Sequence, residues 1–146
     1  HRAKSVGLIS SFVRMTYYWL DYVIGVPLIL RKNAQFNKIT IFDRYIYDFI
    51  SDPERARIKL PFRLRMMFAK LIKKPNVVFI LEADAETIHR RKQELTIDEI
   101  NHQLKSLHRL AVSGKYFYIL DATKTPEEIA MDAIKITFDL TTNKLQ

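Results

Sequence analysis

Three polar side chains follow directly after an apolar run in this chain of 146 residues. Asp43, Arg44 and Tyr45 come immediately after the segment 38–42. A carboxylate can hold a magnesium ion directly or through water, and a guanidinium can clamp a phosphate with two parallel hydrogen bonds. These residue types suit phosphoryl transfer, which needs positioned charges and little covalent chemistry from the protein. The alternative interpretation is a turn at the end of a strand with a surface salt bridge.

A second group of charges lies in the run 89–92, His-Arg-Arg-Lys. Arg90 and Arg91 could bring cations over a transferring phosphoryl group, where they would stabilise the charge of the transition state. The alternative is a solvated helix face on which Glu86 pairs with Arg90 at a spacing of four residues.

These side chains need elements that bring them together. Apolar runs predict three buried strands, at 38–43, 76–83 and 116–122, separated by long helical segments. This order predicts an α/β fold, a three-layer arrangement of a parallel sheet with flanking helices. Ligands of such sheets bind outside the carboxyl ends of the strands, where polar residues follow all three runs: Asp43, Arg44, Tyr45, Glu82, Asp84, Asp121 and Thr123.

The helices are indicated by spacing and by capping residues. Apolar residues at three- and four-residue steps predict a helix over 6–24, ended or kinked by Gly25 and Pro27. A basic helical region follows over 52–74, with Pro61 opening its second part. Three later helices are expected to begin at the caps Asp84, Thr96 (with Glu99) and Thr125 (with Glu128).

Composition limits the class of protein. The chain is 48% apolar, has no cysteine, and carries a formal charge of +8 with a pI near 9.7. We therefore expect one globular domain over 1–146 in a reducing, cytoplasmic setting, with an anionic partner. The longest apolar stretch, 17–30, is interrupted by a charge, a glycine and a proline, so no transmembrane segment is expected.

Three stretches of the chain resemble the thymidylate kinases and related P-loop nucleoside monophosphate kinases. IFDRYIYD is similar to their Asp-Arg-Tyr/His motif, PNVVFILEADAETIHRRKQE to the strand, helix and Arg-rich lid that follow, and YFYILDATKTPEEI to their last strand and its loop. The match covers roughly residues 40–140 in the same order. It implies a P-loop NTPase-like fold and an enzyme that uses ATP and Mg²⁺ to phosphorylate a nucleoside monophosphate or a similar small acceptor.

The resemblance also implies a role for each matching position. Arg44, with Tyr45 beside it, would hold the acceptor; Asp43 would lie beside the metal; Arg90 and Arg91 would be lid cations on the donor phosphates; Asp121, Ala122 and Thr123 would lie near the donor base. Tyr17, Tyr18 and Trp19 lie in the helix before this motif, where the family often packs the acceptor base; Tyr17 is the candidate ring, with packing in the core or against a partner as the alternative. The aromatic helix that carries it could also supply a homodimer face.

One defining motif of these kinases is absent from the sequence. The phosphate-binding loop Gly-x-x-x-x-Gly-Lys-Ser/Thr cannot be built from Gly7, Gly25 and Gly114, the three glycines of the chain. We expect a domain that is incomplete at its N-terminus and lacks the first strand and its loop. The alternative is an inactive kinase-like scaffold that binds nucleic acid, an acidic membrane surface or a protein partner through the basic segment 54–74.

Overall fold

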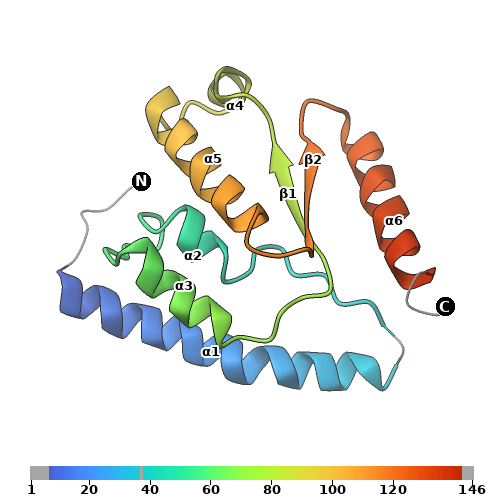
Figure 1. Cartoon of the computed structure of the whole chain (residues 1–146), viewed down its shortest axis with the longest axis horizontal. Coiled ribbons are helices and arrows are strands. Elements are labelled where there is room, and N and C mark those ends of the chain that lie inside the picture. The colour runs from blue at the N-terminus through green and yellow to red at the C-terminus, as the bar shows by residue number, and fades with distance from the viewer. Residues whose placement is uncertain (1–6, 37, 143–146) are drawn as a thin grey trace. The chain divides into compact units, whose positions relative to one another are not determined.

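The computed structural model describes residues 7–36 and 38–142, which divide into two compact units. The first unit ends at Lys74 and the second begins at Pro75. The elements of the first are α1 (Leu8–Ala34), α2 (Asp48–Ser51) and α3 (Phe62–Lys70). Those of the second are β1 (Val78–Glu82), α4 (Ala85–Arg91), α5 (Ile97–Ala111), β2 (Phe117–Asp121) and α6 (Pro126–Thr142) (Figure 1).

The core of the first unit forms where one face of α1 packs on α2 and α3. Met15 of α1, together with Ile46 and Ile50, has no exposed surface. Two rings of α1, Phe12 and Trp19, meet the ring of Phe68 edge-on, with centroids 5.7 and 6.1 Å apart. Large aromatic side chains therefore supply most of the contact between the long helix and the chain that follows it.

The predicted strand over 38–43 is not formed. These residues run as extended, irregular chain, and the side chains of Ile39 and Ile41 are 81% and 88% exposed. A strand needs a neighbour to pair its backbone groups, and apolar composition alone supplies none. The prediction of a buried inner strand here is therefore wrong for the structure as it stands.

Gly25 and Pro27 do not end α1, which continues to Ala34. Proline removes one backbone donor, so the carbonyl of Val23 loses its usual partner four residues on. The helix is long enough to tolerate the loss of this one hydrogen bond. The prediction that the helix ends near residue 24 is therefore wrong by nearly three turns, and the alternative, a kink at these residues, stays a prediction.

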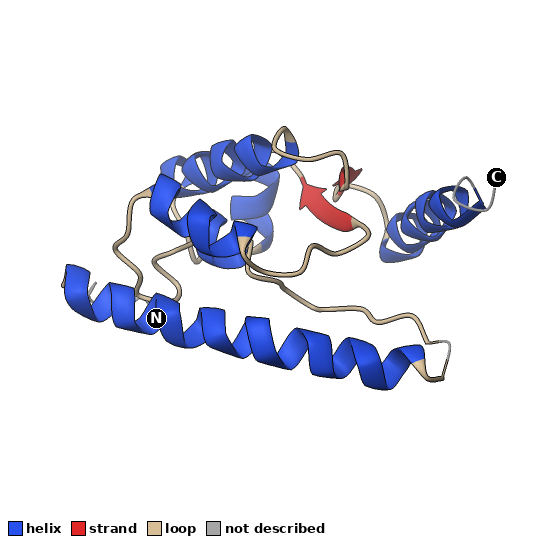
Figure 2. Ribbon diagram, turned by 60° about the horizontal axis from the view of Figure 1, so that its bottom comes forward, coloured by secondary structure: helices blue, strands red, loops and turns tan. Residues whose placement is uncertain are grey.

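The second unit is built on a parallel pair of strands. β1 and β2 pair in register from Val78 with Phe117 to Glu82 with Asp121. The connection between them passes through α4 and α5, as a parallel pair requires. Figures 1 and 2 draw α5 and α6 on opposite sides of the strand pair. The predicted strands at 76–83 and 116–122 are confirmed, whereas a wider three-layer sheet stays a prediction.

Local capping signals fix where three helices of this unit begin. The carboxylate of Asp84 accepts a hydrogen bond from the backbone N–H of Thr87 at 2.7 Å. Thr96 and Glu99 form a reciprocal capping box, in which the Thr96 N–H donates to the Glu99 carboxylate at 2.8 Å. Thr125 and Glu128 repeat this arrangement before α6, with hydrogen bonds of 2.9 and 3.3 Å. All three predicted caps are confirmed.

No helix in the described parts of the chain has both the length and the apolarity that crossing a bilayer requires.

Candidate functional site

Arg44 has an unusual backbone conformation in the first unit. Its φ is 77°, in the left-handed region, which costs a residue with a side chain about 1–2 kcal/mol. The conformation turns the extended segment into the short helix α2. Nη1 of Arg44 donates to Oδ2 of Asp48 at 2.9 Å, and the side chain remains 51% exposed. The guanidinium is thus held at the surface with most of its five N–H donors available.

The residues after Arg44 anchor this turn in the core. Tyr45, Ile46 and Tyr47 are all buried. The Tyr45 hydroxyl donates to the backbone carbonyl of Lys73 at 2.6 Å, and its ring meets that of Tyr22 at 5.1 Å. Burial, with a smaller contribution from Tyr22, raises the pKa of Tyr45 to about 12. The Tyr45 hydroxyl therefore fixes the turn, and its contact with an acceptor stays a prediction.

A buried arginine holds α2 in place. The Arg65 side chain is only 8% exposed, and its Nη1 donates to the carbonyls of Phe49 and Ile50. Burial lowers the pKa of Arg65 below its ordinary value. The two bonds satisfy carbonyls at the end of the helix whose first residue is Asp48. Arg65 therefore differs from the exposed cations of the basic segment 54–74, because its guanidinium lies in the core.

Asp43 presents a single exposed carboxylate beside Arg44. Within residues 7–36 and 38–142, no group of three or more His, Cys, Asp or Glu side chains is placed to hold a metal ion. Magnesium commonly uses one or two carboxylates and takes its other ligands from water and substrate phosphates. Asp43 therefore fits an ion that arrives with a nucleotide and does not fit a site built from protein ligands alone.

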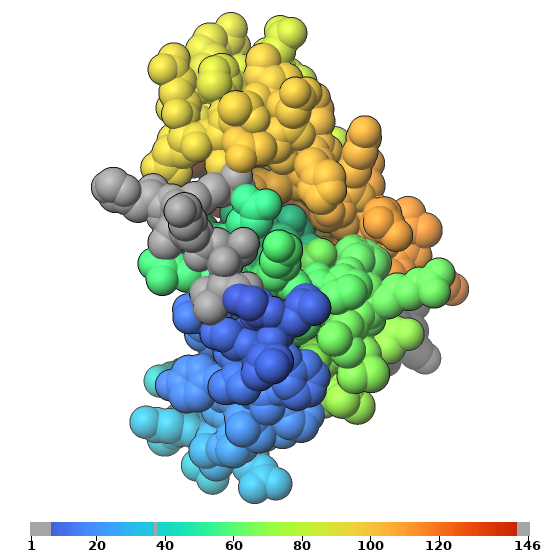
Figure 3. Space-filling view, turned by 90° about the vertical axis from the view of Figure 1, so that its left-hand side faces the viewer, coloured from blue at the N-terminus to red at the C-terminus, as the bar shows by residue number. Residues whose placement is uncertain are grey.

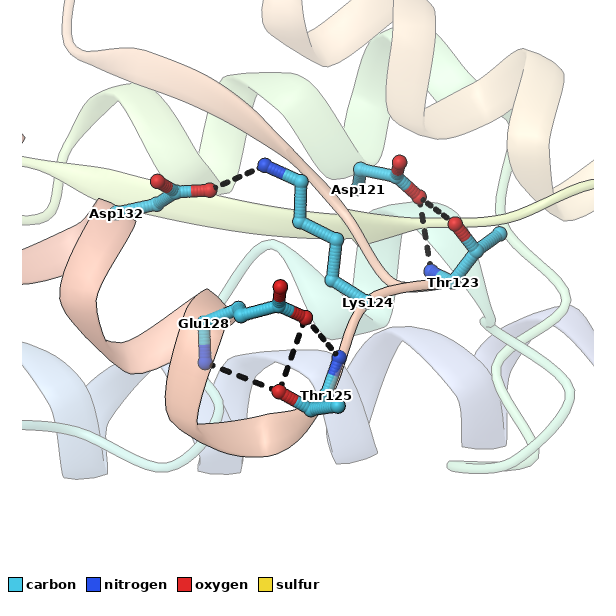
Figure 4. Close-up of polar contacts among 6 residues, drawn as sticks. All are labelled: Asp121, Thr123, Lys124, Thr125, Glu128 and Asp132. Carbon is cyan, nitrogen blue, oxygen red and sulfur yellow. Dashed lines mark hydrogen bonds and ion pairs between the residues drawn. The ribbon is translucent and has the colours of Figure 1, made fainter.

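The second unit gathers four predicted residues at the carboxyl end of β2. Nη1 of Arg91 donates to the carbonyl of Ala122 at 2.6 Å. Oδ1 of Asp121 accepts from the backbone N–H and the hydroxyl of Thr123 at 2.8 and 2.6 Å (Figure 4). These hydrogen bonds from Thr123, with smaller contributions from Lys124 and Arg91, lower the pKa of Asp121. The loop thus holds a fixed anion with an exposed cation beside it.

Arg90 lies one residue earlier on α4, with its side chain exposed. The pKa of Asp84 is lowered chiefly by its hydrogen bonds with Thr87, and the charge of Arg90 adds a smaller effect. In the described part of the chain Glu86 and Arg90 form no ion pair, so the surface pairing considered from the sequence is not what orients Arg90.

Two contacts between a basic and an acidic side chain near the strand ends were not anticipated. Nε2 of His108 lies 2.9 Å from Oε1 of Glu82, which ends β1. Nζ of Lys124 lies 2.7 Å from Oδ2 of Asp132, and this hydrogen bond raises the pKa of Lys124 (Figure 4). Glu82 and His108 are 26 residues apart in the sequence, whereas Lys124 and Asp132 are 8 apart. Only the second pair could have been expected from the local sequence, because Lys124 lies in the loop just before a helix and Asp132 lies in the first two turns of that helix.

Tyr17 lies on the outer side of α1, where it is 69% exposed. Its ring touches only the edge of the cluster that contains Tyr45: Tyr17 meets Tyr18 at 5.8 Å, and Tyr18 stacks on Phe49 at 4.7 Å. The rings of this helix that meet rings of the chain after it include Phe12, Tyr18, Trp19 and Tyr22.

The predicted site residues thus fall into two sets. Asp43, Arg44 and Tyr45 are consecutive residues of the first unit, and in the second unit Arg91 contacts the loop 121–123 while Arg90 precedes it on α4. Comparison with known proteins gave no match to a family model, a curated protein or a solved structure.

Proposed function

We propose that this protein takes part in phosphoryl transfer of the thymidylate kinase type, moving the γ-phosphoryl group of ATP to a nucleoside monophosphate or a similar small acceptor. The observation that supports this most directly is the left-handed backbone of Arg44, which presents a guanidinium next to an exposed carboxylate. Strained backbone is often found where a side chain must be aimed at a ligand.

In the proposed reaction Arg44 binds the acceptor phosphate. Its ion pair with Asp48 uses one N–H donor and sets the direction of the guanidinium, leaving a pair of donors for phosphate oxygens. Asp43 would hold Mg²⁺ together with phosphate oxygens and water, and the ion, when bound, neutralises charge on the phosphates. The protein's part is positioning and charge compensation, because phosphoryl transfer asks for little else.

Residues of the second unit are assigned to the donor. Arg90 and Arg91 supply cations for its phosphates, and the loop 121–123 contacts its base. The bond from Arg91 to the carbonyl of Ala122 supports this grouping, because it ties a lid cation to the same loop. The proposal keeps the reducing, cytoplasmic setting that the absence of cysteine favours.

The loop that cradles phosphates in P-loop kinases is not among residues 1–146. The proposal therefore assigns acceptor binding, the metal-binding carboxylate and the lid to these residues. It does not assign the phosphate-binding loop to them. Acceptor binding is the first property to measure, since it depends on residues that the chain contains.

The test replaces Arg44 in the intact protein and measures the affinity for nucleoside monophosphates by calorimetry. Arg44→Ala should weaken binding about a hundredfold, because two charge-assisted hydrogen bonds are lost. Arg57→Ala is the matched control: Arg57 is also an exposed arginine with left-handed backbone, at φ 55°. Equal affinity of the Arg44→Ala variant and the unaltered protein would refute the assignment.

A second candidate function is the binding of a polyanion through the segment 54–74. Seven cations of this segment face water: Arg55, Arg57, Lys59, Arg63, Lys70, Lys73 and Lys74. Such a surface attracts the phosphates of nucleic acid without reading sequence. This role requires neither Asp43 nor Arg44, so it remains if the kinase proposal fails.

A further inference from the structure

The outer side of α3 and of the residues that follow it exposes two apolar side chains among cations. Met67 and Leu71 are one helical turn apart and are 51% and 63% exposed. Four exposed basic side chains accompany them, and we call the six residues the basic–apolar face: Arg63, Met67, Lys70, Leu71, Lys73 and Lys74. Figure 3 shows side chains of this segment, in green, at the surface beside α1 in blue. Single exposed apolar residues are ordinary, whereas an apolar pair among charges of one sign indicates a partner with both apolar and anionic parts.

The packing of α3 fixes the direction of this face. Phe68 and Ile72, on the opposite side, are only 6% and 4% exposed. Nη1 of Arg65 donates to two carbonyls of α2, and the carbonyl of Lys73 accepts from the hydroxyl of Tyr45. Contacts of this kind hold the segment at both ends, so the basic–apolar face cannot turn inward without disrupting a packed core.

The positive charge of the chain is concentrated in the first unit. Residues 1–74 contain 15 Lys or Arg and five Asp or Glu, whereas residues 75–146 contain nine and 11. The formal charge of +8 therefore arises from the first unit. The stretch 55–74 contains no acidic residue, so the basic–apolar face lies in a region that attracts anions.

We propose that the basic–apolar face binds the surface of a membrane rich in acidic phospholipids. The lysines and Arg63 contact the anionic headgroups, and Met67 and Leu71 enter the boundary between headgroups and acyl chains. This inference does not depend on the proposed phosphoryl transfer, because the face contains no residue assigned to the acceptor or the donor. It also goes beyond attraction of a polyanion, because it gives the apolar pair a role.

The apolar pair distinguishes a membrane from a nucleic acid. The backbone of duplex DNA offers phosphates to the cations but no apolar layer to Met67 and Leu71. In an acidic bilayer the anionic headgroups lie over hydrocarbon, so both kinds of side chain find suitable surroundings at once. The long apolar stems of lysine and arginine suit this position, because they let the charge remain at the level of the headgroups.

Vesicle sedimentation tests the proposal with the intact protein. We expect binding to vesicles of equal parts phosphatidylcholine and phosphatidylserine, and none to phosphatidylcholine alone. The double variant M67Q/L71Q should weaken binding about tenfold, because it removes apolar surface that hydrocarbon would cover. R63Q/K70Q should weaken it roughly thirtyfold, because it removes two cations near an acidic surface. Circular dichroism checks that each variant is folded.

The helix α6 offers a matched apolar pair as the control. Met131 and Ile134 are 64% and 60% exposed, close to the values for Met67 and Leu71. Their helix carries four acidic residues and one lysine: Glu127, Glu128, Asp132, Asp139 and Lys135. Because an acidic membrane repels such a surface, M131Q/I134Q should leave vesicle binding unchanged.

A fluorescent label tests the position of the apolar pair without weakening the charges. The chain has no cysteine, so Met67→Cys and Met131→Cys each provide one site for an environment-sensitive fluorophore. With the mixed vesicles, emission from position 67 should shift to shorter wavelength and be quenched by lipids that carry a spin label on the acyl chain. Emission from position 131 should not change.

Four results would overturn the proposal. The first is no binding to the mixed vesicles, and the second is equal affinity of M67Q/L71Q and the unaltered protein. The third is an equal loss in M131Q/I134Q, and the fourth is a label at position 67 that stays in water. Duplex DNA should bind M67Q/L71Q as it binds the unaltered protein. Binding to DNA without binding to vesicles would assign the basic–apolar face to nucleic acid.

Discussion

At the scale of single residues, the candidate site depends on side chains whose surroundings differ sharply from those of their neighbours in sequence. Asp43 and Arg44 face water, whereas Tyr45 is buried and hydrogen-bonded. Alternation of this kind lets a core residue fix the position of a surface residue. The contact of Tyr45 with Lys73 therefore matters to Arg44 even though it involves no ligand.

Tyr45 gives a prediction with a defined pH dependence. Its pKa is raised from 10 to about 12, so the folded state favours the neutral phenol. The associated stability is complete below about pH 10 and is lost as the pH rises toward 12. Tyr45→Phe should cost about 1–2 kcal/mol near neutral pH through the lost hydrogen bond, and it should remove part of the alkaline loss of stability.

Urea unfolding of the two proteins near neutral pH and in alkali measures both effects. Tyr118→Phe, which changes a half-buried tyrosine of β2, serves as the control. The same decline in alkali for the Tyr45→Phe variant and the unaltered protein would show that another group is responsible.

The sequence identified surface charges better than buried ones. Asp43 and Arg44 were chosen by their position after an apolar run and Arg91 by its place in the basic run 89–92, and all three are exposed. Arg65 belongs to the basic segment 54–74, yet it lies three residues before Phe68 and seven before Ile72, on the buried side of its segment. Composition favours exposure for arginine, and only the carbonyls of Phe49 and Ile50 make its burial favourable.

At the scale of elements, the features that depend on near neighbours in sequence were predicted best. Both capping boxes and the Asp84 cap join residues three positions apart, and all are formed. The strand at 38–43 depended on a distant partner and is not formed. Which face of α1 is buried could not be predicted either, because both faces are apolar and periodicity does not say which one meets the core.

The capping box before α5 supports a prediction at this scale. Thr96→Ala removes the acceptor for the Glu99 N–H and should lower the free energy of unfolding by about 1 kcal/mol. Thr96→Ser keeps the hydroxyl and should retain most of that stability. Chemical denaturation followed by circular dichroism measures the difference, and equal losses in the two variants would contradict the role of the hydroxyl.

At the scale of the whole molecule, the charge of +8 has a direct consequence for binding. We expect association with duplex DNA to weaken as salt is added, with a slope of about −0.9 in log K against log salt for each phosphate neutralised. The double variant R63Q/K70Q, on the exposed side of α3, should reduce the slope by about 2. Lys135→Gln, exposed on α6, is the control. Fluorescence anisotropy measures the slope, and an unchanged slope would exclude α3 from the contact.

The organisation of the chain was only partly accessible from sequence. The parallel pair and its helical crossover follow from two apolar runs with capped helices between them. The division into two compact units at Lys74 and Pro75 did not follow, since the boundary has no long flexible linker to mark it. The boundary falls within a short Lys-Lys-Pro stretch.

The backbone of Arg44 sets two requirements of the molecule against each other. Glycine adopts φ 77° without steric cost, so stability alone would place glycine at position 44. Arginine costs about 1 kcal/mol there, a noticeable share of the 5–15 kcal/mol that keeps a typical domain folded. On the proposed function this is the stability–activity trade-off confined to one residue. Screening for greater thermal stability would tend to remove the very side chain to which the proposal assigns acceptor binding.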